Sequence, residues 1–123
     1  MIIETISRFY EDNILLFDPI KNVPDDLGAE LGEILAQSNG IQEVFFNPET
    51  GDTEVLGWII YSLEKIQEET AFYKENYNIQ GIVFSDDGAG NPFYIVEDKI
   101  YKYNAIDDES ELCANSLEEF YTK

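Results

Sequence analysis

The residues most able to do chemistry lie in one short glycine-containing loop, residues 86–91. Asp86, Asp87 and Asn91 carry hard oxygen donors of the kind that bind calcium. Their order does not match the alternating D-x-[DN]-x-[DN]-G pattern of a calcium loop, whereas Gly88 and Gly90 suit a tight reversal of the backbone. Two adjacent aspartates without a lysine would also repel a phosphate. The loop therefore predicts a structural turn, with no metal and no cofactor.

Catalysis has few routes in this chain, because it contains no histidine. Histidine is the usual general base and the usual zinc ligand. A pair of carboxylates, as in glycoside hydrolysis, remains chemically feasible. With 26 aspartates and glutamates in 123 residues, however, such pairs arise by chance. We expect a protein that is not an enzyme, and a carboxylate-based hydrolase is the third of three hypotheses.

Aromatic residues in strand-like segments are the next candidates. In the segment 99–103, alternation sends Tyr101 and Tyr103 to one face of a strand and Ile100 to the other. If Ile100 packs inward, the tyrosines form an outward surface that can anchor a partner, since tyrosine is common at interface centres. The alternative is that they pack beneath a helix. Trp58 lies in an apolar run and is expected in the core.

Acidic groups cluster in the predicted loops around the same strands. Charge runs of this kind usually form a solvated face, but their convergence at one sheet would favour a binding surface. Together with the two tyrosines they make up the predicted partner-binding residues: Asp86, Asp87, Glu97, Asp98, Tyr101, Tyr103, Asp107, Asp108 and Glu109.

The formal net charge of −19, from 26 acidic and 7 basic residues, limits the classes of partner. Proteins bind nucleic acids and anionic membranes through clusters of Lys and Arg, whereas the basic residues of this chain are scattered. Complementary potentials instead favour a basic protein as partner. The alternative is that the charge serves only solubility. The single cysteine, Cys113, is typical of a reducing compartment and is expected to be a small buried residue, so a cytoplasmic location is predicted, whereas the oligomeric state is left open.

The pattern of apolar residues predicts helices and strands that must position these groups. Helices are expected from the first residues to the break at Asp12, from Pro24 to Asn39, after Ser62 to residue 77, and after Ser116, where Ser116 and Glu119 form a capping box. Strands are expected at residues 14–17, 44–46, 54–61, 81–85, 92–96 and 99–103. Strands and helices do not alternate regularly. The sequence therefore predicts one α+β domain, residues 1–123, with a mainly antiparallel central sheet flanked by helices.

Several segments, in order, resemble one known family. They are residues 84–96 followed by 100–103, residues 23–27 (VPDDL), residues 38–40 (SNG), residues 58–66 (WIIYSLEKI) and residues 116–120 (SLEEF). Taken together they resemble the SUKH superfamily, the Smi/Knr-like domains, over about residues 1–122. The chain departs from longer members of the family in being compact, with a short loop at residues 47–53.

The resemblance implies an α+β domain with helices around a central sheet that acts by binding proteins and not by catalysis. Many bacterial members look like immunity proteins against polymorphic toxins, often nucleases, and fungal relatives act as signalling scaffolds. Combined with the charge, it predicts a cytoplasmic immunity protein that occludes the active cleft of a basic toxin. A regulatory scaffold without a toxin is the alternative.

Overall fold

The computed structural model describes residues 2–122. In chain order these residues form α1 (Ile2–Phe9), β1 (Ile14–Leu16), the 3-10 helix η1 (Asp25–Leu27), α2 (Ala29–Gln37), β2 (Ile41–Phe46), β3 (Thr53–Ile60), α3 (Leu63–Tyr77), β4 (Ile82–Asp86), β5 (Pro92–Val96), β6 (Lys99–Asn104), β7 (Glu109–Ala114) and α4 (Leu117–Phe120). The predicted α+β class is confirmed, and the strands in this part of the chain pair antiparallel. Within residues 2–122, no helix combines the length and the apolar character needed to cross a membrane.

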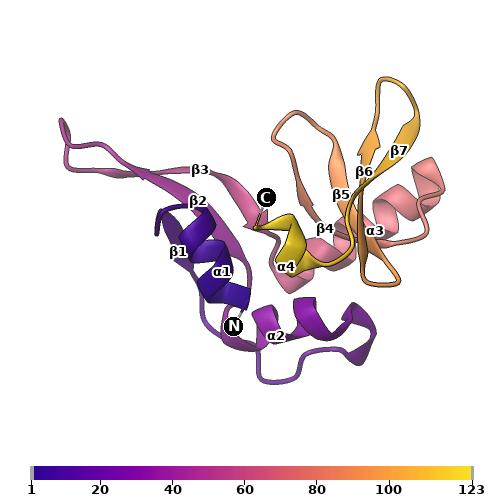
Figure 1. The fold of residues 1–123 in the computed structure, drawn as a ribbon, viewed down its shortest axis with the longest axis horizontal. Helices are drawn as coiled ribbons and strands as arrows, with labels where there is room; N and C mark the ends of the chain where they lie inside the picture. The colour runs from indigo at the N-terminus through magenta and orange to yellow at the C-terminus, as the bar shows by residue number, and fades with distance from the viewer. Residues whose placement is uncertain (1, 123) are drawn as a thin grey trace.

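The strands are divided between two sheets, where the sequence suggested one central sheet. One has the order β1-β2-β3 and the other the order β4-β5-β6-β7. Figure 1 shows the second sheet with α3 beside it, while α1, α2 and α4 lie between the two sheets and along their edges. The sheets meet where β3 ends, because the amide of Tyr61 donates a hydrogen bond to the carbonyl of Phe84 (2.7 Å).

Helix boundaries follow local capping chemistry. The Ser62 hydroxyl accepts a hydrogen bond from the amide of Lys65 (3.3 Å), and the Ser116 hydroxyl accepts one from the amide of Glu119 (3.0 Å). Both serines therefore begin helices as predicted, since a side-chain oxygen satisfies an otherwise unpaired amide. The helix predicted from Pro24 is interrupted at Gly28, whose φ of 86° is not helical.

Helix α4 is also capped by a residue distant in the sequence. The carboxylate of Glu30, on α2, accepts hydrogen bonds from the amides of Leu117 (2.8 Å) and Glu118 (3.1 Å). A carboxylate at a helix N-terminus satisfies free amides and interacts favourably with the helix dipole. This contact fixes the closing helix against the first half of the chain.

One hydrophobic core joins the elements of both sheets. Its fully buried members come from every region of the fold and include Ile6, Leu31, Ile34, Leu35, Ile41, Ile60, Ile66, Val83, Phe84, Ile100 and Leu117. Leu31, Ile34 and Leu35, spaced three and four residues apart, form one buried face of α2. Because α1 and α4 both contribute, the two ends of the described chain pack in the same region, where the candidate site lies.

Strand β7 was not predicted, and Glu109 lies in it rather than in a loop. The segment carries Glu109 and Glu111, and acidic residues are depleted in strands. The structure tolerates them because β7 is an edge strand with most of its residues exposed. Charged side chains are common on such edges, where they discourage pairing with other chains.

Candidate partner-binding site

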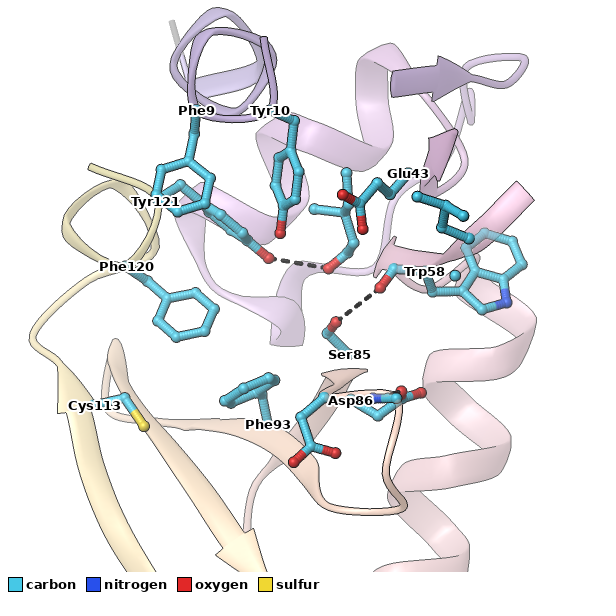
Figure 2. Close-up of a pocket in the computed structure, with 15 residues that line it drawn as sticks. Phe9, Tyr10, Glu43, Trp58, Ser85, Asp86, Phe93, Cys113, Phe120 and Tyr121 are labelled. Atoms are coloured by element: carbon cyan, nitrogen blue, oxygen red, sulfur yellow. Dashed lines mark hydrogen bonds between the residues drawn. The ribbon is translucent and has the colours of Figure 1, made fainter. Parts of the chain in front are cut away.

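A pocket lies between the two sheets, beneath α1 and α4 (Figure 2). It has a volume of about 470 Å³. Its lining residues come from α1, β2, β3, β4, β5, β7 and α4 and from the loops beside them, so it depends on both sheets and not on one motif. A pocket with an apolar lining and a few polar groups is the usual form of a recognition site.

One wall of the pocket is a chain of aromatic rings. The ring of Tyr10 lies 6.3 Å from that of Tyr121, which lies 4.9 Å from Phe120, and Phe120 lies 4.9 Å from Phe93. The Tyr121 hydroxyl donates a hydrogen bond to the carbonyl of Ile59 (3.0 Å), which ties α4 to β3. Edge-to-face and tilted ring contacts of this kind stabilise the wall.

The opposite side of the pocket combines an indole ring with carboxylates. Trp58 lies on the side opposite Phe120 in Figure 2, and Glu43 and Asp86 carry their carboxylates nearby. Asp87 also lines the pocket. Three carboxylates therefore border the pocket, and none of its lining residues is Lys or Arg.

Two of these carboxylates lie close to tyrosines, and one of them is held by a tyrosine hydrogen bond. The Tyr61 hydroxyl donates a hydrogen bond to Asp86, whose other oxygen accepts one from the amide of Gly88 (2.8 Å). Burial raises the pKa of Tyr61 far above its usual value of 10, and the hydrogen bond to Asp86 adds to this. Burial, with the charge of Glu43, likewise raises the pKa of Tyr10. Both tyrosines therefore stay protonated beside the carboxylates.

This arrangement suits a cationic side chain. An ammonium or guanidinium group is attracted to the faces of Trp and Tyr rings, and a carboxylate at the same site adds a charge-assisted hydrogen bond. Arginine fits such a site particularly well because its planar group both stacks and forms paired hydrogen bonds. The pocket can thus recognise a basic side chain presented by another protein.

Asp87 also stabilises the loop that closes this side of the pocket. Its Oδ1 accepts hydrogen bonds from the amides of Ala89 (2.8 Å) and Asn91 (3.1 Å), its Oδ2 accepts one from Asn91 Nδ2 (2.9 Å), and Lys102 Nζ lies 3.3 Å away. Partial burial alone would raise the pKa of Asp87, but the hydrogen bonds and Lys102 outweigh it and lower the pKa to about 2. The loop 86–91 is accordingly a hydrogen-bonded turn.

Replacing this residue (Asp87→Asn) is expected to lower the free energy of unfolding by about 1 kcal/mol at pH 7, after allowance for solvent screening. Because the pKa is lower in the folded than in the unfolded chain, the carboxylate stabilises the fold above about pH 4 and loses this effect toward pH 2. Urea unfolding of both proteins between pH 7 and pH 2.5 tests this. The difference in the free energy of unfolding between the unmodified chain and Asp87→Asn should become smaller toward pH 2.5. A difference that does not change with pH would contradict the lowered pKa of Asp87 as its cause.

The predicted acidic residues fall into two groups at opposite ends of the sheet formed by β4 to β7. The β4–β5 loop and the β6–β7 turn lie at the same end in Figure 1, and Asn91 links them by accepting a hydrogen bond from the amide of Ala105 (2.9 Å). This end gathers Asp86, Asp87, Asp107, Asp108 and Glu109. Glu97 and Asp98 form the β5–β6 turn at the other end, away from the pocket.

The outward aromatic surface predicted from Tyr101 and Tyr103 is wrong for Tyr103. Tyr103 is only 4% exposed and its ring lies 5.5 Å from Tyr77 of α3, so it packs beneath a helix. Ile100 is also buried. Strand β6 pairs with β5 in unbroken register, so Ile100 and Tyr103 lie on opposite faces of the strand, and both faces are covered. Tyr101 is half-buried and stacks on Tyr94 (5.5 Å).

Tyr103 also engages one of the predicted acidic residues. Its hydroxyl donates a hydrogen bond to Asp108, and this bond, with a smaller effect of burial, raises the pKa of Tyr103 to about 12. Asp108 thus has a structural partner within its own turn. Neither residue belongs to the pocket.

Most pocket residues were not singled out in the sequence. Glu43, Phe93 and Phe120 lie far apart in the chain, and each reads locally as an ordinary strand or helix residue. Trp58 was expected in the core but is partly buried and faces the pocket, and Cys113 is also only partly buried there. Only the acidic pair Asp86 and Asp87 was predicted, because adjacent aspartates before a glycine stand out.

The carboxylates of the described residues are not grouped as metal ligands. Among residues 2–122, no group of three or more Cys, Asp or Glu side chains is arranged to hold a metal ion. The oxygen donors of the loop 86–91 accept hydrogen bonds from its own backbone and from neighbouring side chains.

Comparison with known proteins gives one match. The model of the SMI1 / KNR4 family (SUKH-1) matches residues 20–123, which is most of the chain and includes most of the pocket. No curated protein and no solved structure matches. The matched residues exclude α1, so Phe9 and Tyr10 are pocket residues outside the family pattern.

Proposed function

The chain belongs to the SMI1 / KNR4 (SUKH-1) family, and from this premise we propose that it is a cytoplasmic immunity protein that neutralises a basic toxin domain by binding it. The toxin is proposed to be a nuclease, and the chain is proposed to act as one binding domain without catalysis of its own. Resemblance to the superfamily implies this mode of action, and the geometry of the pocket supports it.

The observation that carries the proposal is the pocket itself. Aromatic rings line it, and Glu43, Asp86 and Asp87 border it. No Lys or Arg is among its lining residues, and Lys102, which pairs with Asp87, leaves Glu43 and Asp86 without a basic partner among the ion pairs of the described residues. A nuclease binds phosphates, so its active cleft carries Lys and Arg. A protein with a net charge of −19 attracts such a cleft from a distance, and the pocket supplies the short-range contacts to one basic side chain.

Inhibition would follow from competition for one surface. The acidic groups of the pocket and of the adjacent β6–β7 turn occupy the region that phosphates would otherwise enter. Electrostatic complementarity raises the association rate and disfavours partners of the wrong charge. Contacts at the pocket then determine how long the complex lasts.

Co-expression tests the biological role. Cells that produce the toxin domain encoded next to this chain's gene should survive when the chain is also produced. A regulatory scaffold of the same family would rescue no cell. Absence of rescue, together with absence of binding between the purified proteins, would refute the immunity function.

The ionic-strength dependence of binding tests the electrostatic mechanism. Salt shortens the Debye length from about 30 Å at 0.01 M to about 3 Å at 1 M. The association rate with the toxin domain, measured by stopped flow, is expected to fall by one to two orders of magnitude over this range. A rate that does not change with salt would remove electrostatic steering from the account.

A further inference from the structure

The hairpin of β2 and β3 extends away from the rest of the molecule (Figure 1). We define its outer part, residues 44–56, as the distal arm. Its strands pair only with each other, through Val44 with Val55, Phe45 with Glu54 and Phe46 with Thr53. Strand β1 ends its pairing at Glu43, and the amide of Val44 at the base of the arm donates a hydrogen bond to the carbonyl of Asn13 (3.0 Å), so the support from this side stops at Val44.

Large apolar side chains are exposed on the distal arm. The exposed fractions are 47% for Phe45, 56% for Phe46, 55% for Val55 and 58% for Leu56. Cross-strand partners share a face and neighbours along a strand alternate, so Phe46 and Val55 lie on one face and Phe45 on the other. A concentration of exposed apolar groups on one element marks an interaction surface.

The arm also lacks support from the core. A two-stranded hairpin alone is marginally stable in water. A partner that covers the exposed side chains would stabilise the arm as well as gain apolar contact. The arm is moreover continuous with the candidate site, because Leu56, the bulged residue opposite Glu43 and Val44, lines the pocket.

Charge indicates which kind of partner fits the arm. The hairpin, residues 41–60, carries Glu43, Glu49, Asp52 and Glu54 and no Lys or Arg. A second copy of this chain would bring the same charges together on a molecule of net charge −19, and like charges across an interface are unfavourable. An anionic membrane is disfavoured for the same reason.

We propose that the distal arm is a second docking element, which inserts Phe46 and Val55 into an apolar groove bordered by Lys or Arg on a partner protein. This inference rests on the proposed function, because the partner is the basic toxin domain. The acidic residues of the arm would pair with the rim of the groove, and the apolar side chains would fill it. Arm and pocket together would hold the partner at two points.

A double variant, Phe46→Thr with Val55→Thr, tests the arm. Threonine keeps the β-branched shape that strands favour and removes most of the apolar surface. Binding of the toxin domain encoded next to this chain's gene, measured by calorimetry, is expected to weaken by 10-fold to 100-fold. The matched control is Phe72→Ala on α3, where the apolar side chain is 48% exposed and lies outside both the pocket and the arm, and its affinity should equal that of the unmodified chain.

Amide hydrogen exchange gives a second measurement that does not depend on the variants. Amides of residues 44–46 and 53–56 should exchange rapidly in the free chain and become protected in the complex.

Two results would overturn the arm as a docking element and leave the proposed function intact. One is an unchanged affinity of the double variant, and the other is a normal complex in which the amides of the arm stay unprotected. A toxin domain that does not bind the unmodified chain would overturn both. If the unmodified chain sediments as a dimer and the double variant as a monomer, the arm binds a second copy of the chain. That result would overturn the proposal that the arm binds a basic partner.

Discussion

Replacing Glu43 with lysine (Glu43→Lys) is expected to weaken binding of the basic toxin domain by about 100-fold, which corresponds to about 2.7 kcal/mol. The half-buried Glu43 lies at the pocket beside Tyr10, and lysine there replaces an attraction for a basic side chain by a repulsion. Removing one partner of a charge pair at an interface costs several kcal/mol when the pair is desolvated. Calorimetric titration of both proteins with the toxin domain measures the effect.

The matched control is Glu68→Lys on α3. Glu68 is exposed and does not line the pocket, and the substitution changes the net charge by the same amount. Its effect should be limited to a modest decrease in the association rate, because only long-range steering changes. Equal losses of affinity for the two variants would show that overall charge, and not the pocket, governs binding.

Replacing Phe84 with alanine (Phe84→Ala) is expected to lower the free energy of unfolding by about 3–5 kcal/mol, the largest effect on stability in this account. Phe84 is fully buried, and its carbonyl accepts the hydrogen bond from Tyr61 that joins the two sheets. Its ring also contacts Phe120, 6.3 Å away, behind the aromatic wall of the pocket. Truncation removes apolar contacts and leaves a cavity in the region where the sheets meet.

Urea unfolding at neutral pH measures this effect, with Phe84→Leu as the control. Leucine fills much of the same volume and should cost less than half as much as alanine. If alanine cost less than about 1 kcal/mol, Phe84 would not be a central packing residue. The junction between the sheets would then have to be stabilised elsewhere.

Local chemistry explains which parts of the fold the sequence predicted. Ser62 and Ser116 mark helix starts because a serine hydroxyl satisfies a nearby amide wherever the rest of the chain lies. Strands β4, β5 and β6 were predicted for the same reason, since turns rich in glycine and aspartate separate these short apolar strands. Capping serines and turn residues act through contacts within a few residues, so their effect depends little on the rest of the fold.

Long-range contacts explain what the sequence did not predict. Strand β7 is rich in acidic residues and becomes a strand through its pairing with β6. The burial of Tyr103 depends on the end of α3, whose Tyr77 packs against it, while Ile100 is buried on the opposite face of β6; coverage of both faces is not visible in the pattern of residues 99–103. Secondary structure that depends on tertiary contacts is not encoded in local propensity.

The pocket was unpredictable for a related reason. Its aromatic wall joins Tyr10 of the N-terminal region with Phe93 and with Phe120 of α4, more than 80 residues from Tyr10 along the chain. Only Asp86 and Asp87 lie within a recognisable motif. The other predicted acidic residues keep their place near the site through the β6–β7 turn, or lie at the opposite end of the sheet, as Glu97 and Asp98 do.

The most direct test of the central claim uses Trp58, the single tryptophan of the chain, which lines the pocket. The chain can be labelled with 5-fluorotryptophan and titrated with the unlabelled toxin domain while the fluorine resonance is recorded. We predict that the resonance shifts, saturates at a one-to-one ratio, and fails to shift in Glu43→Lys at the same concentrations. A complex that forms by calorimetry while the Trp58 resonance stays unchanged would contradict the claim that the partner occupies the pocket.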